Sequence, residues 1–212
     1  TWEVMGLAGT GSKNVRVTDQ FVPEYRTISA AELAEGAFEY RQPGKPVYQV
    51  KRGMMFQAAI GAGTIGIAQG VLQAYRDHTM NRVTMMGEVK RNDPFQLAAY
   101  AEAASDVNVS RMSLLQNMAD VYDAYARGED VSVEQRLAFR RDQVRGSYRS
   151  WRALENLFQI AGGSSTYLRS PVQRFIRDLS VGSHHVSNVA APVYTAWGSY
   201  DFTGQMMNPV AH

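Results

Sequence analysis

The sequence predicts a mainly α protein, in which the last strands of a β domain precede a C-terminal antiparallel four-helix-bundle domain. Apolar residues recur near a period of 3.6 through long windows after residue 45, and the links between these windows are short. In the first 45 residues, by contrast, β-branched and aromatic residues alternate between glycine-rich turns. We therefore expect the end of a β domain over residues 1–45 and a helical bundle domain over residues 46–212.

The composition of the first segment predicts short strands and turns. Val15 and Val17, followed by Phe21 and Val22, stand among glycine-rich turns, a composition typical of short strands. Because the chain opens with Thr1 inside this pattern, we expect it to be a fragment of a longer protein.

Three long helices are expected in the rest of the chain. The first covers roughly residues 53–82. The second, about 30 residues long by its period, begins at Asp93-Pro94 and stops at Gly128. The third covers 132–160, where "SVEQ" has the form of a capping box. A shorter helix is expected to begin near Ser170, and the C-terminal stretch after it is ambiguous.

The stretch "GAGTIG", Gly61 to Gly66, has the G-x-G-x-x-G spacing of a dinucleotide-binding loop. Helical spacing continues through it from Phe56 and Ile60 to Ile67, so we place these glycines inside the first long helix. An interior glycine costs about 0.8–1.0 kcal/mol relative to alanine, and close approach of a helix or a cofactor would compensate. Glu88 stands near the spacing of a ribose-binding acid, but no strand precedes it.

Net charge and the absence of cysteine exclude several classes of function. With 22 basic against 20 acidic residues and a net charge of +2, no field of one sign would attract nucleic acid or an anionic membrane. The absence of cysteine excludes disulfides, thiolate catalysis and cysteine-ligated metals, so redox chemistry would need a cofactor. With no continuous apolar run of membrane-spanning length and no leader, we expect a soluble cytoplasmic protein.

Three motifs in order carry a resemblance to a known family. They are "GLAGTGSKNVRVTDQFVPEYR" from Gly6, "RNDPFQLAAYAEAASDV" from Arg91 and "FQIAGGSSTYLRSPVQRFIRDLSVGSHH" from Phe158. Together they resemble the end of the central β domain and the C-terminal four-helix domain of the acyl-CoA dehydrogenase superfamily, over nearly all of the chain. The resemblance implies that an N-terminal helical domain and the first β strands are missing. In that superfamily they help to enclose the flavin, so this chain would hold part of the site.

The tail after Arg177-Asp178 points to one branch of the superfamily. Dehydrogenases usually carry a glutamate base eight to nine residues beyond that pair, whereas "SHHVSN" has no carboxylate there. Two-component flavin-dependent monooxygenases resemble this chain instead, with a histidine matching His185 and the "GGSS" stretch. The resemblance implies an oxygenase component that takes FADH2 or FMNH2 from a separate flavin reductase. With O2, it would hydroxylate a small aromatic substrate, expected to be a phenol, through a C4a-hydroperoxyflavin; N- or S-oxygenation stays open.

His185 is the candidate catalytic residue. Free imidazole ionises near pH 6.5, so its neutral form can accept the proton of a phenol at neutral pH. His184 has less weight, and the alternative is that both rings satisfy backbone groups at a chain bend. A metal site is not expected, because the remaining histidines, His78 and His212, have no carboxylate at a ligand spacing nearby.

The resemblance also implies flavin contacts. Arginine suits phosphate oxygens, and the positions that touch the phosphate side of the flavin, often across a subunit boundary, are matched by Arg82, Phe95 and Gln96, with Arg91 or Lys90 as replacements for Arg82. The "GGSS" stretch would allow close backbone approach, and the Arg-Asp pair would form a bracing ion pair or approach the flavin; plain helix capping and solvation are the alternatives. These cofactor candidates are Gly162, Gly163, Ser164, Ser165, Arg177 and Asp178.

Two other functions stay open. One is an acyl-CoA dehydrogenase whose base has moved to Glu155 or Glu134. The other is a non-catalytic helical assembly module, in which the methionine- and glycine-rich stretch 53–86 is interface alone. For any of the three we expect a homotetramer, or a dimer, because relatives pack their C-terminal domains together and small apolar residues abound.

Overall fold

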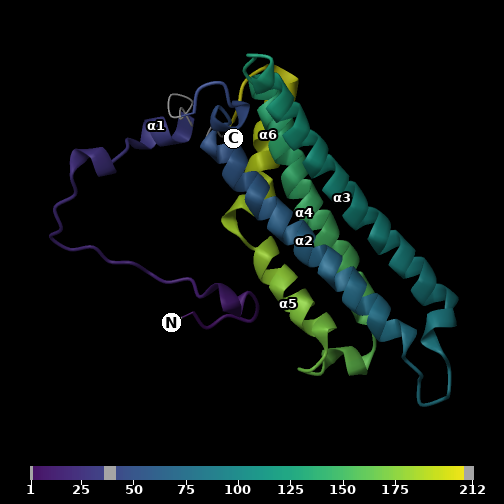
Figure 1. The fold of residues 1–212 in the computed structure, drawn as a ribbon. Helices are drawn as coiled ribbons and strands as arrows, with labels where there is room; N and C mark the ends of the chain where they lie inside the picture. The colour runs from purple at the N-terminus through teal and green to yellow at the C-terminus, as the bar shows by residue number, and fades with distance from the viewer. Residues whose placement is uncertain (1, 36–41, 208–212) are drawn as a thin grey trace.

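The computed structural model describes residues 2–35 and 42–207. In these ranges the chain is helical after a long extended segment (Figure 1). The helices are α1 (Ala30–Glu35), α2 (Arg52–Met80), α3 (Pro94–Ala126), α4 (Val133–Ile160), α5 (Pro171–Ser183) and α6 (Ala190–Thr203).

Three long helices, α2, α3 and α4, lie side by side, with α4 in contact with every other helix from α2 to α6 (Figure 1). Helix α5 packs on α2 and α4, and α6 packs on α4. Successive long helices run in opposite directions, and the two shorter helices share the fourth position of the bundle. The predicted mainly α, antiparallel bundle is confirmed.

The predicted start signals act as expected. The carboxylate of Asp93 accepts the backbone N–H groups of Phe95 and Gln96 at the start of α3, and Ser132 and Gln135 form a reciprocal capping box at the start of α4. Both devices bond N–H groups that have no partner inside the helix. The ambiguous C-terminal stretch forms α6, where Pro192 stands in the first turn and so removes no intrahelical bond.

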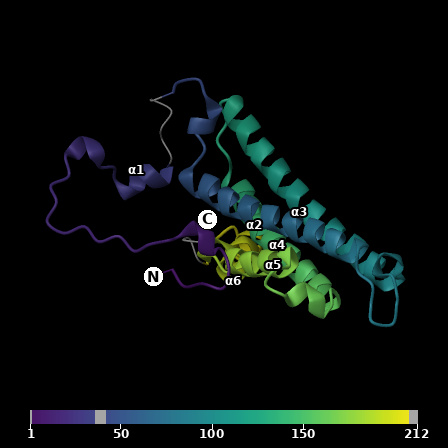
Figure 2. The same cartoon turned by 60° about the horizontal axis from the view of Figure 1, so that its bottom comes forward.

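The strands expected in the first segment are not formed in the described residues. Val15, Val17 and Phe21 are 85%, 70% and 90% exposed on extended backbone, and both views show this part of the chain standing away from the bundle (Figures 1 and 2). A strand needs a neighbour to bond its N–H and C=O groups, and none lies beside these residues. Their assignment to a separate β domain ending near residue 45 stays a prediction.

Helix α2 runs unbroken through Gly61–Gly66, as predicted. A Cβ atom on Gly61 would come within 2.9 Å of Gln143 Cγ, and one on Gly70 within 2.9 Å of the Phe175 ring. Gly63 and Gly66 have no atom within 4 Å of such a Cβ. Close packing therefore explains Gly61 and Gly70, whereas Gly63 leaves open space.

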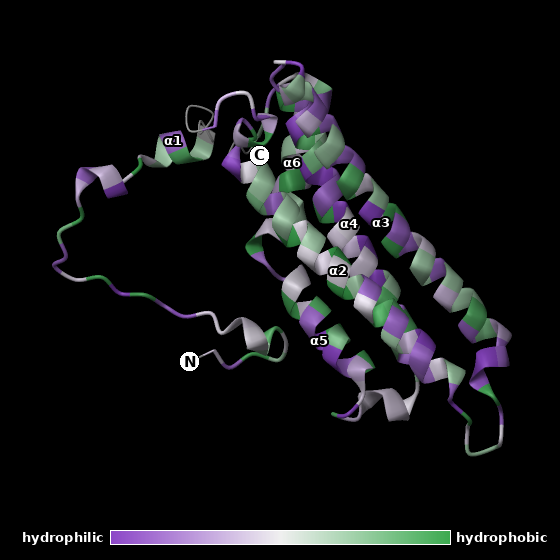
Figure 3. Ribbon diagram, in the orientation of Figure 1, coloured by the Kyte–Doolittle hydropathy of each residue, from purple (hydrophilic) through white to green (hydrophobic). Residues whose placement is uncertain are grey.

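The most apolar part of α2 has a mean hydropathy of 1.3 over 18 residues, of which 33% are buried. By length and composition alone this helix could cross a membrane, which corrects the expectation that the chain holds no such stretch. No continuous apolar run is visible in the sequence, because glycine, alanine and threonine separate the large apolar residues of α2. Green and white alternate along this helix for that reason (Figure 3). One such helix is weak evidence, since core helices of water-soluble bundles pass the same test.

The core consists of two apolar clusters along the bundle. One includes Leu114 and Phe139, and the other includes Leu154 and Leu179. Along α3 and α4 several residues between the clusters are polar and buried, among them Ser110, Arg140, Gln143 and Ser147. The bundle therefore contains a buried polar layer.

Candidate active site

A cavity of about 570 Å³ lies between α2, the end of α5 and the first residues of the chain. Helix α2 supplies Ile60, Gly63 and Thr64 to its lining, and the end of α5 supplies His184 and His185. No carboxylate is among the described lining residues. The walls are mainly apolar, and the two imidazoles are the titratable groups on the described lining. We call this space the histidine cavity.

The two histidines make opposite hydrogen bonds to the backbone. His184 is the C-cap of α5, and its Nδ1 lies 2.7 Å from the carbonyl oxygen of Ser180. His185 precedes the next helical turn, and its Nδ1 accepts the N–H of Ser187 at 3.1 Å. The ring of His185 also lies 5.9 Å from the Phe56 ring, centroid to centroid. Both rings thus satisfy backbone groups at a bend and line the cavity at once.

A chain of hydrogen bonds, buried at its α4 end and partly buried beyond it, leads to Gly182 and Thr64 in the cavity lining. Arg140 donates from Nη1 to Gln143 Oε1, Gln143 Nε2 donates to Asn188 Oδ1 at 2.9 Å, and Asn188 Nδ2 donates to the carbonyl of Gly182 at 2.9 Å. The same amide lies 3.5 Å from Thr64 Oγ1. Burial lowers the pKa of Arg140 to about 10, and this guanidinium pairs with no carboxylate in the described part of the chain.

Arg177 and Asp178 hold the N-terminal segment against α5. Arg177 Nη1 donates to the carbonyl of Met5, and Asp178 Oδ1 accepts the N–H of Leu7, both at 2.6 Å. A Cβ atom on Gly6 would overlap the backbone carbonyl of Arg177. Since Leu7 lines the histidine cavity, Arg177 and Asp178 support one of its walls. They do so through these separate bonds to the N-terminal segment, and the expected ion pair between the two is not formed.

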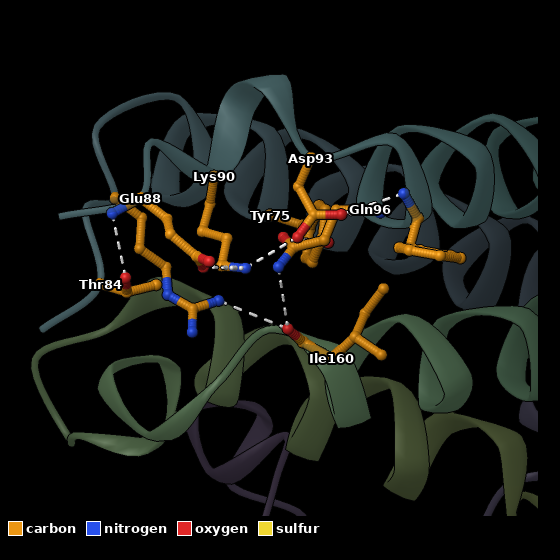
Figure 4. A network of polar contacts seen from close by, with 9 residues as sticks. Tyr75, Thr84, Glu88, Lys90, Asp93, Gln96 and Ile160 are labelled. Atoms are coloured by element: carbon orange, nitrogen blue, oxygen red, sulfur yellow. Dashed lines mark hydrogen bonds and ion pairs between the residues drawn. The ribbon is translucent and has the colours of Figure 1, made fainter. Parts of the chain in front are cut away.

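The other predicted cofactor residues gather near the far end of α2. Arg82 Nη1 and Gln96 Nε2 both approach the carbonyl oxygen of Ile160, at 3.4 and 3.5 Å, and Gln96 Oε1 accepts the Tyr75 hydroxyl at 3.0 Å (Figure 4). The guanidinium of Arg82 lies against Gly162, whose φ is 77°. We call these residues, with the Gly163–Thr166 turn, the turn cluster.

His78 secures the "GGSS" stretch in the turn cluster. Its Nε2 lies 3.3 Å from the carbonyl oxygen of Ala161 and 3.3 Å from Ser164 Oγ. Burial lowers the pKa of His78, because the charged ring loses water there. Ser165 is fully buried and donates to the carbonyl of Gly162 at 2.7 Å.

The remaining residues around the turn cluster differ in exposure. The Phe95 side chain is 84% exposed. Lys90 forms ion pairs with Asp93 and Glu88 at 2.8 and 3.1 Å, and Arg91 approaches the carbonyl of Met80 at 3.5 Å. Phe95 is thus the member of this group that is most open to a partner.

The turn cluster and the histidine cavity are separate places. His78 and Gly63 are both on α2, and at 1.5 Å per residue they are about 22 Å apart along its axis. His185, Arg177 and Asp178 therefore gather at one place, and Arg82, Gln96 and Gly162–Ser165 gather at another.

Sequence reasoning missed the polar chain and the role of His78. The signal for the polar chain was available, since Arg140, Gln143, Ser147 and Ser150 recur at spacings of three and four along α4, where an apolar face is expected. Buried polar residues in that pattern predict a hydrogen-bonded layer. The described residues hold no cluster of three metal-ligating side chains, and His212 lies outside them.

The two carboxylates named as alternative bases do not line the cavity. Glu155 bonds Arg152 at 3.1 Å, and Glu134 is exposed in the first turn of α4.

Comparison with known proteins places these features in a family. The oxygenase subunit HsaA of a flavin-dependent monooxygenase from Mycobacterium tuberculosis (strain H37Rv) is 35% identical over 95% of this chain and 52% of its own length. The oxygenase component of an FADH(2)-dependent resorcinol hydroxylase from Rhizobium sp. is 32% identical over 88% of this chain and 48% of its own. The crystal structure of 3-HSA hydroxylase from Rhodococcus sp. RHA1 superimposes with a TM-score of 0.91 at 34% identity, covering 100% of this chain and 55% of that one.

The chain thus spans about half the length of the curated relatives it matches. A family model described as "Acyl-CoA dehydrogenase, C-terminal domain" matches residues 58–189, which include most of α2, all of α3 to α5 and both cavity histidines. The chain therefore belongs to the acyl-CoA dehydrogenase C-terminal domain family.

Proposed function

We propose that the protein is the oxygenase component of a two-component flavin monooxygenase. It takes FADH2 or FMNH2 from a separate reductase and hydroxylates a small phenol with O2. One observation carries this proposal: the described lining of the histidine cavity has two imidazoles and no carboxylate. The printed names of the relatives, a flavin-dependent monooxygenase and a resorcinol hydroxylase, support it.

The cavity fits aromatic rings. Its volume of about 570 Å³ is in the range of small-molecule sites, and Gly63 leaves open space where another residue would project a side chain. Apolar α2 residues such as Ile60 would exclude water from the reacting atoms. When bound, the reduced flavin supplies two electrons to O2, so that one oxygen atom enters the substrate and the other leaves as water.

We further propose that the turn cluster serves the phosphate side of a flavin held mainly by another subunit of a homotetramer. A guanidinium fork matches phosphate oxygens, and the exposed Phe95 precedes Gln96 in the first turn of α3. Leu97, Met112 and Leu115 form an exposed apolar row on a different side of α3, which a neighbouring copy would cover. We expect the assembled enzyme in the cytoplasm.

The test uses the protein at its full natural length, with chemically reduced FAD or FMN in place of the reductase. Incorporation of ¹⁸O from ¹⁸O2 into a phenol, measured by mass spectrometry, is the expected result. Turnover of an acyl-CoA with an electron-accepting dye would instead establish the dehydrogenase. A folded protein that binds no reduced flavin would leave the assembly module.

A further inference from the structure

We propose that the groove between α4 and α6 binds a small aromatic carboxylate. This groove has a volume of about 410 Å³ and lies where α6 packs on α4. Among the described residues it shares no lining with the histidine cavity or the turn cluster, so the inference goes beyond the proposed function and does not depend on it. Its lining residues are Arg141, Asp142 and Arg145 on α4 and Tyr194, Trp197 and Gly198 on α6. We call this place the α6 groove.

Arg141 forms part of the wall of the α6 groove and is not a free cation. Its guanidinium carbon lies 4.4 Å from the centroid of the Trp197 ring, which is a cation–π contact. The Asp142 carboxylate faces the same guanidinium, with Oδ1 at 2.7 Å from both Nε and Nη2. The charge of Arg141 is thus balanced within the chain, and its guanidinium holds the indole in place.

Arg145 is the cation of the α6 groove whose charge is not balanced. It is exposed and stands one turn after Arg141 on α4. Farther along the helix, Arg149 and Arg152 each face a carboxylate, whereas Arg145 has no such partner in the described part of the chain. A guanidinium presents its N–H groups in a flat fork that matches the two oxygens of a carboxylate. The groove therefore carries one positive charge in excess, which favours an anion.

The Tyr194 hydroxyl is a second group in the α6 groove that lacks a partner. Its oxygen is buried, and no well-formed hydrogen bond to it is found among the described residues. Burial raises the pKa of Tyr194, and the nearby Arg145 opposes part of that rise, so the hydroxyl keeps its proton at neutral pH. A buried hydroxyl without a partner is unfavourable, and a carboxylate oxygen would accept its hydrogen. Arg145 and Tyr194 thus offer two kinds of donor to the same anion.

The rest of the α6 groove suits a flat ring. Its walls are mainly apolar, and Tyr194 and Trp197 supply aromatic surfaces on which another ring can pack with an offset or edge to face. A side chain at Gly198 would project into open space, so there is room next to Trp197. A planar ring that bears one carboxylate uses both the aromatic wall and the unpaired donors, whereas inorganic phosphate would gain nothing from the wall.

Benzoate is the probe, and the N–H signals of the tryptophan indoles show where it binds. The full-length protein with ¹⁵N-labelled tryptophan is titrated with benzoate, and the loss of one signal in Trp197→Phe and of another in Trp2→Phe assigns them. Trp197 lines the α6 groove and Trp2 lines the histidine cavity, so the two sites are measured separately. The expected result is a saturable shift of the Trp197 signal. Absence of that shift, or a shift of the Trp2 signal alone, overturns the proposal.

Substitution of Arg145 tests the contact with the anion. In Arg145→Gln the dissociation constant of benzoate, measured at the Trp197 signal, should rise about tenfold or more, because a charge-assisted hydrogen bond is lost. The matched control is Arg152→Gln, which removes the same charge from a position on α4 outside the groove. Its effect should be small, because salt screens a charge that does not touch the ligand. Equal weakening in the two variants refutes the site.

Tyr194→Phe separates a ligand contact from a structural role. Because the hydroxyl has no well-formed hydrogen bond without a ligand, its removal should leave the free energy of unfolding unchanged or higher. The dissociation constant of benzoate should still rise about tenfold, the value of one hydrogen bond to a charged group. A loss of stability with unchanged affinity refutes the contact between Tyr194 and the ligand.

Two further ligands test the chemical class. Benzyl alcohol keeps the ring without the charge and should bind the α6 groove about tenfold more weakly than benzoate. Cyclohexanecarboxylate keeps the charge without the flat ring and should bind about threefold more weakly or worse. Equal affinity for benzyl alcohol refutes the need for an anion, and equal affinity for cyclohexanecarboxylate refutes the need for an aromatic ring. Each of these results can occur with or without phenol hydroxylation, so they do not bear on the proposed function.

Discussion

The histidine cavity and the turn cluster differ in how fully their polar side chains are hydrogen-bonded within the fold. In the turn cluster, Gln96 is 7% exposed and bonds both Tyr75 and the carbonyl of Ile160. In the histidine cavity, each imidazole bonds the backbone through Nδ1, and no hydrogen bond to Nε2 is found among the described residues. The comparison teaches that a polar side chain is available for chemistry only when the fold leaves one of its atoms unpaired.

The largest expected effect comes from breaking the wall of the cavity while leaving the turn cluster intact. In Gly6→Ala the new Cβ would overlap the backbone of Arg177, so the bonds of Met5 and Leu7 to α5 would be lost. Each of these charged hydrogen bonds is worth about 1.5–3 kcal/mol, so hydroxylation should fall roughly tenfold or more.

Limited proteolysis of the first residues of the chain measures the detachment directly. The matched control is Gly9→Ala, because a Cβ there meets no atom within 4 Å. Equal protection of the two variants would show that the N-terminal segment is not held at Gly6.

The converse change breaks the turn cluster and spares the cavity. In Gly162→Ala a non-glycine residue would adopt a φ of 77°, which costs about 1–3 kcal/mol, and its Cβ would also displace the guanidinium of Arg82. Urea denaturation should show that loss in the free energy of unfolding. Gly163→Ala is the control, because its Cβ has open space; a loss as large in the control contradicts the explanation.

A smaller change sharpens the comparison by removing one partner of Gln96. In Tyr75→Phe the buried Oε1 of Gln96 loses the hydroxyl that it accepts at 3.0 Å. An unpaired buried acceptor costs about 1–3 kcal/mol, and we expect the lower part of that range because water can reach a partly open site. Denaturation measures it, with Tyr148→Phe as the control at a half-exposed tyrosine.

The smallest effect is a pH dependence confined to the turn cluster. Burial lowers the pKa of His78 below its ordinary value of 6.5, so the unfolded chain binds the proton more readily than the folded one. The contribution of neutral His78 is therefore complete above pH 6.5 and is lost as the pH falls from there toward the lower folded value. The difference in stability between the unmodified protein and His78→Gln should shrink over that interval; a constant difference would contradict it.

Local signals predicted most of the bundle. The N-terminal starts of α3 and α4 were predicted from Asp93, Pro94 and the Ser132 capping box, because capping interactions act within one helical turn. The prediction of strands around Val15 and Phe21 was wrong, because a strand needs a neighbouring strand and a local pattern cannot show whether one is present. The glycines of α2 were placed correctly, yet only contacts between helices could show that Gly61 meets α4 while Gly63 faces a cavity.

The site was predicted unevenly for the same reason. The place of His185 followed from its distance in sequence to Arg177-Asp178, but the hydrogen bonds of the two cavity histidines depend on the carbonyl of Ser180 and the N–H of Ser187, which are set by how α5 ends. Arg82 and Gln96 were named as cofactor residues by resemblance, and they bond the end of α4. A residue type predicts what a group can do, whereas its partners decide what it does.

The buried chain from Arg140 has a direction. The guanidinium at one end can only donate and the Gly182 carbonyl at the other can only accept, so the amides of Gln143 and Asn188 must both turn their N–H groups toward the cavity floor. Amides act neither as acids nor as bases at ordinary pH, so the chain is a row of fixed dipoles rather than a proton wire. The positive ends of these dipoles are directed toward Gly182 and Thr64, which line the cavity, so under the proposed function a developing negative charge there would meet dipoles that are already oriented.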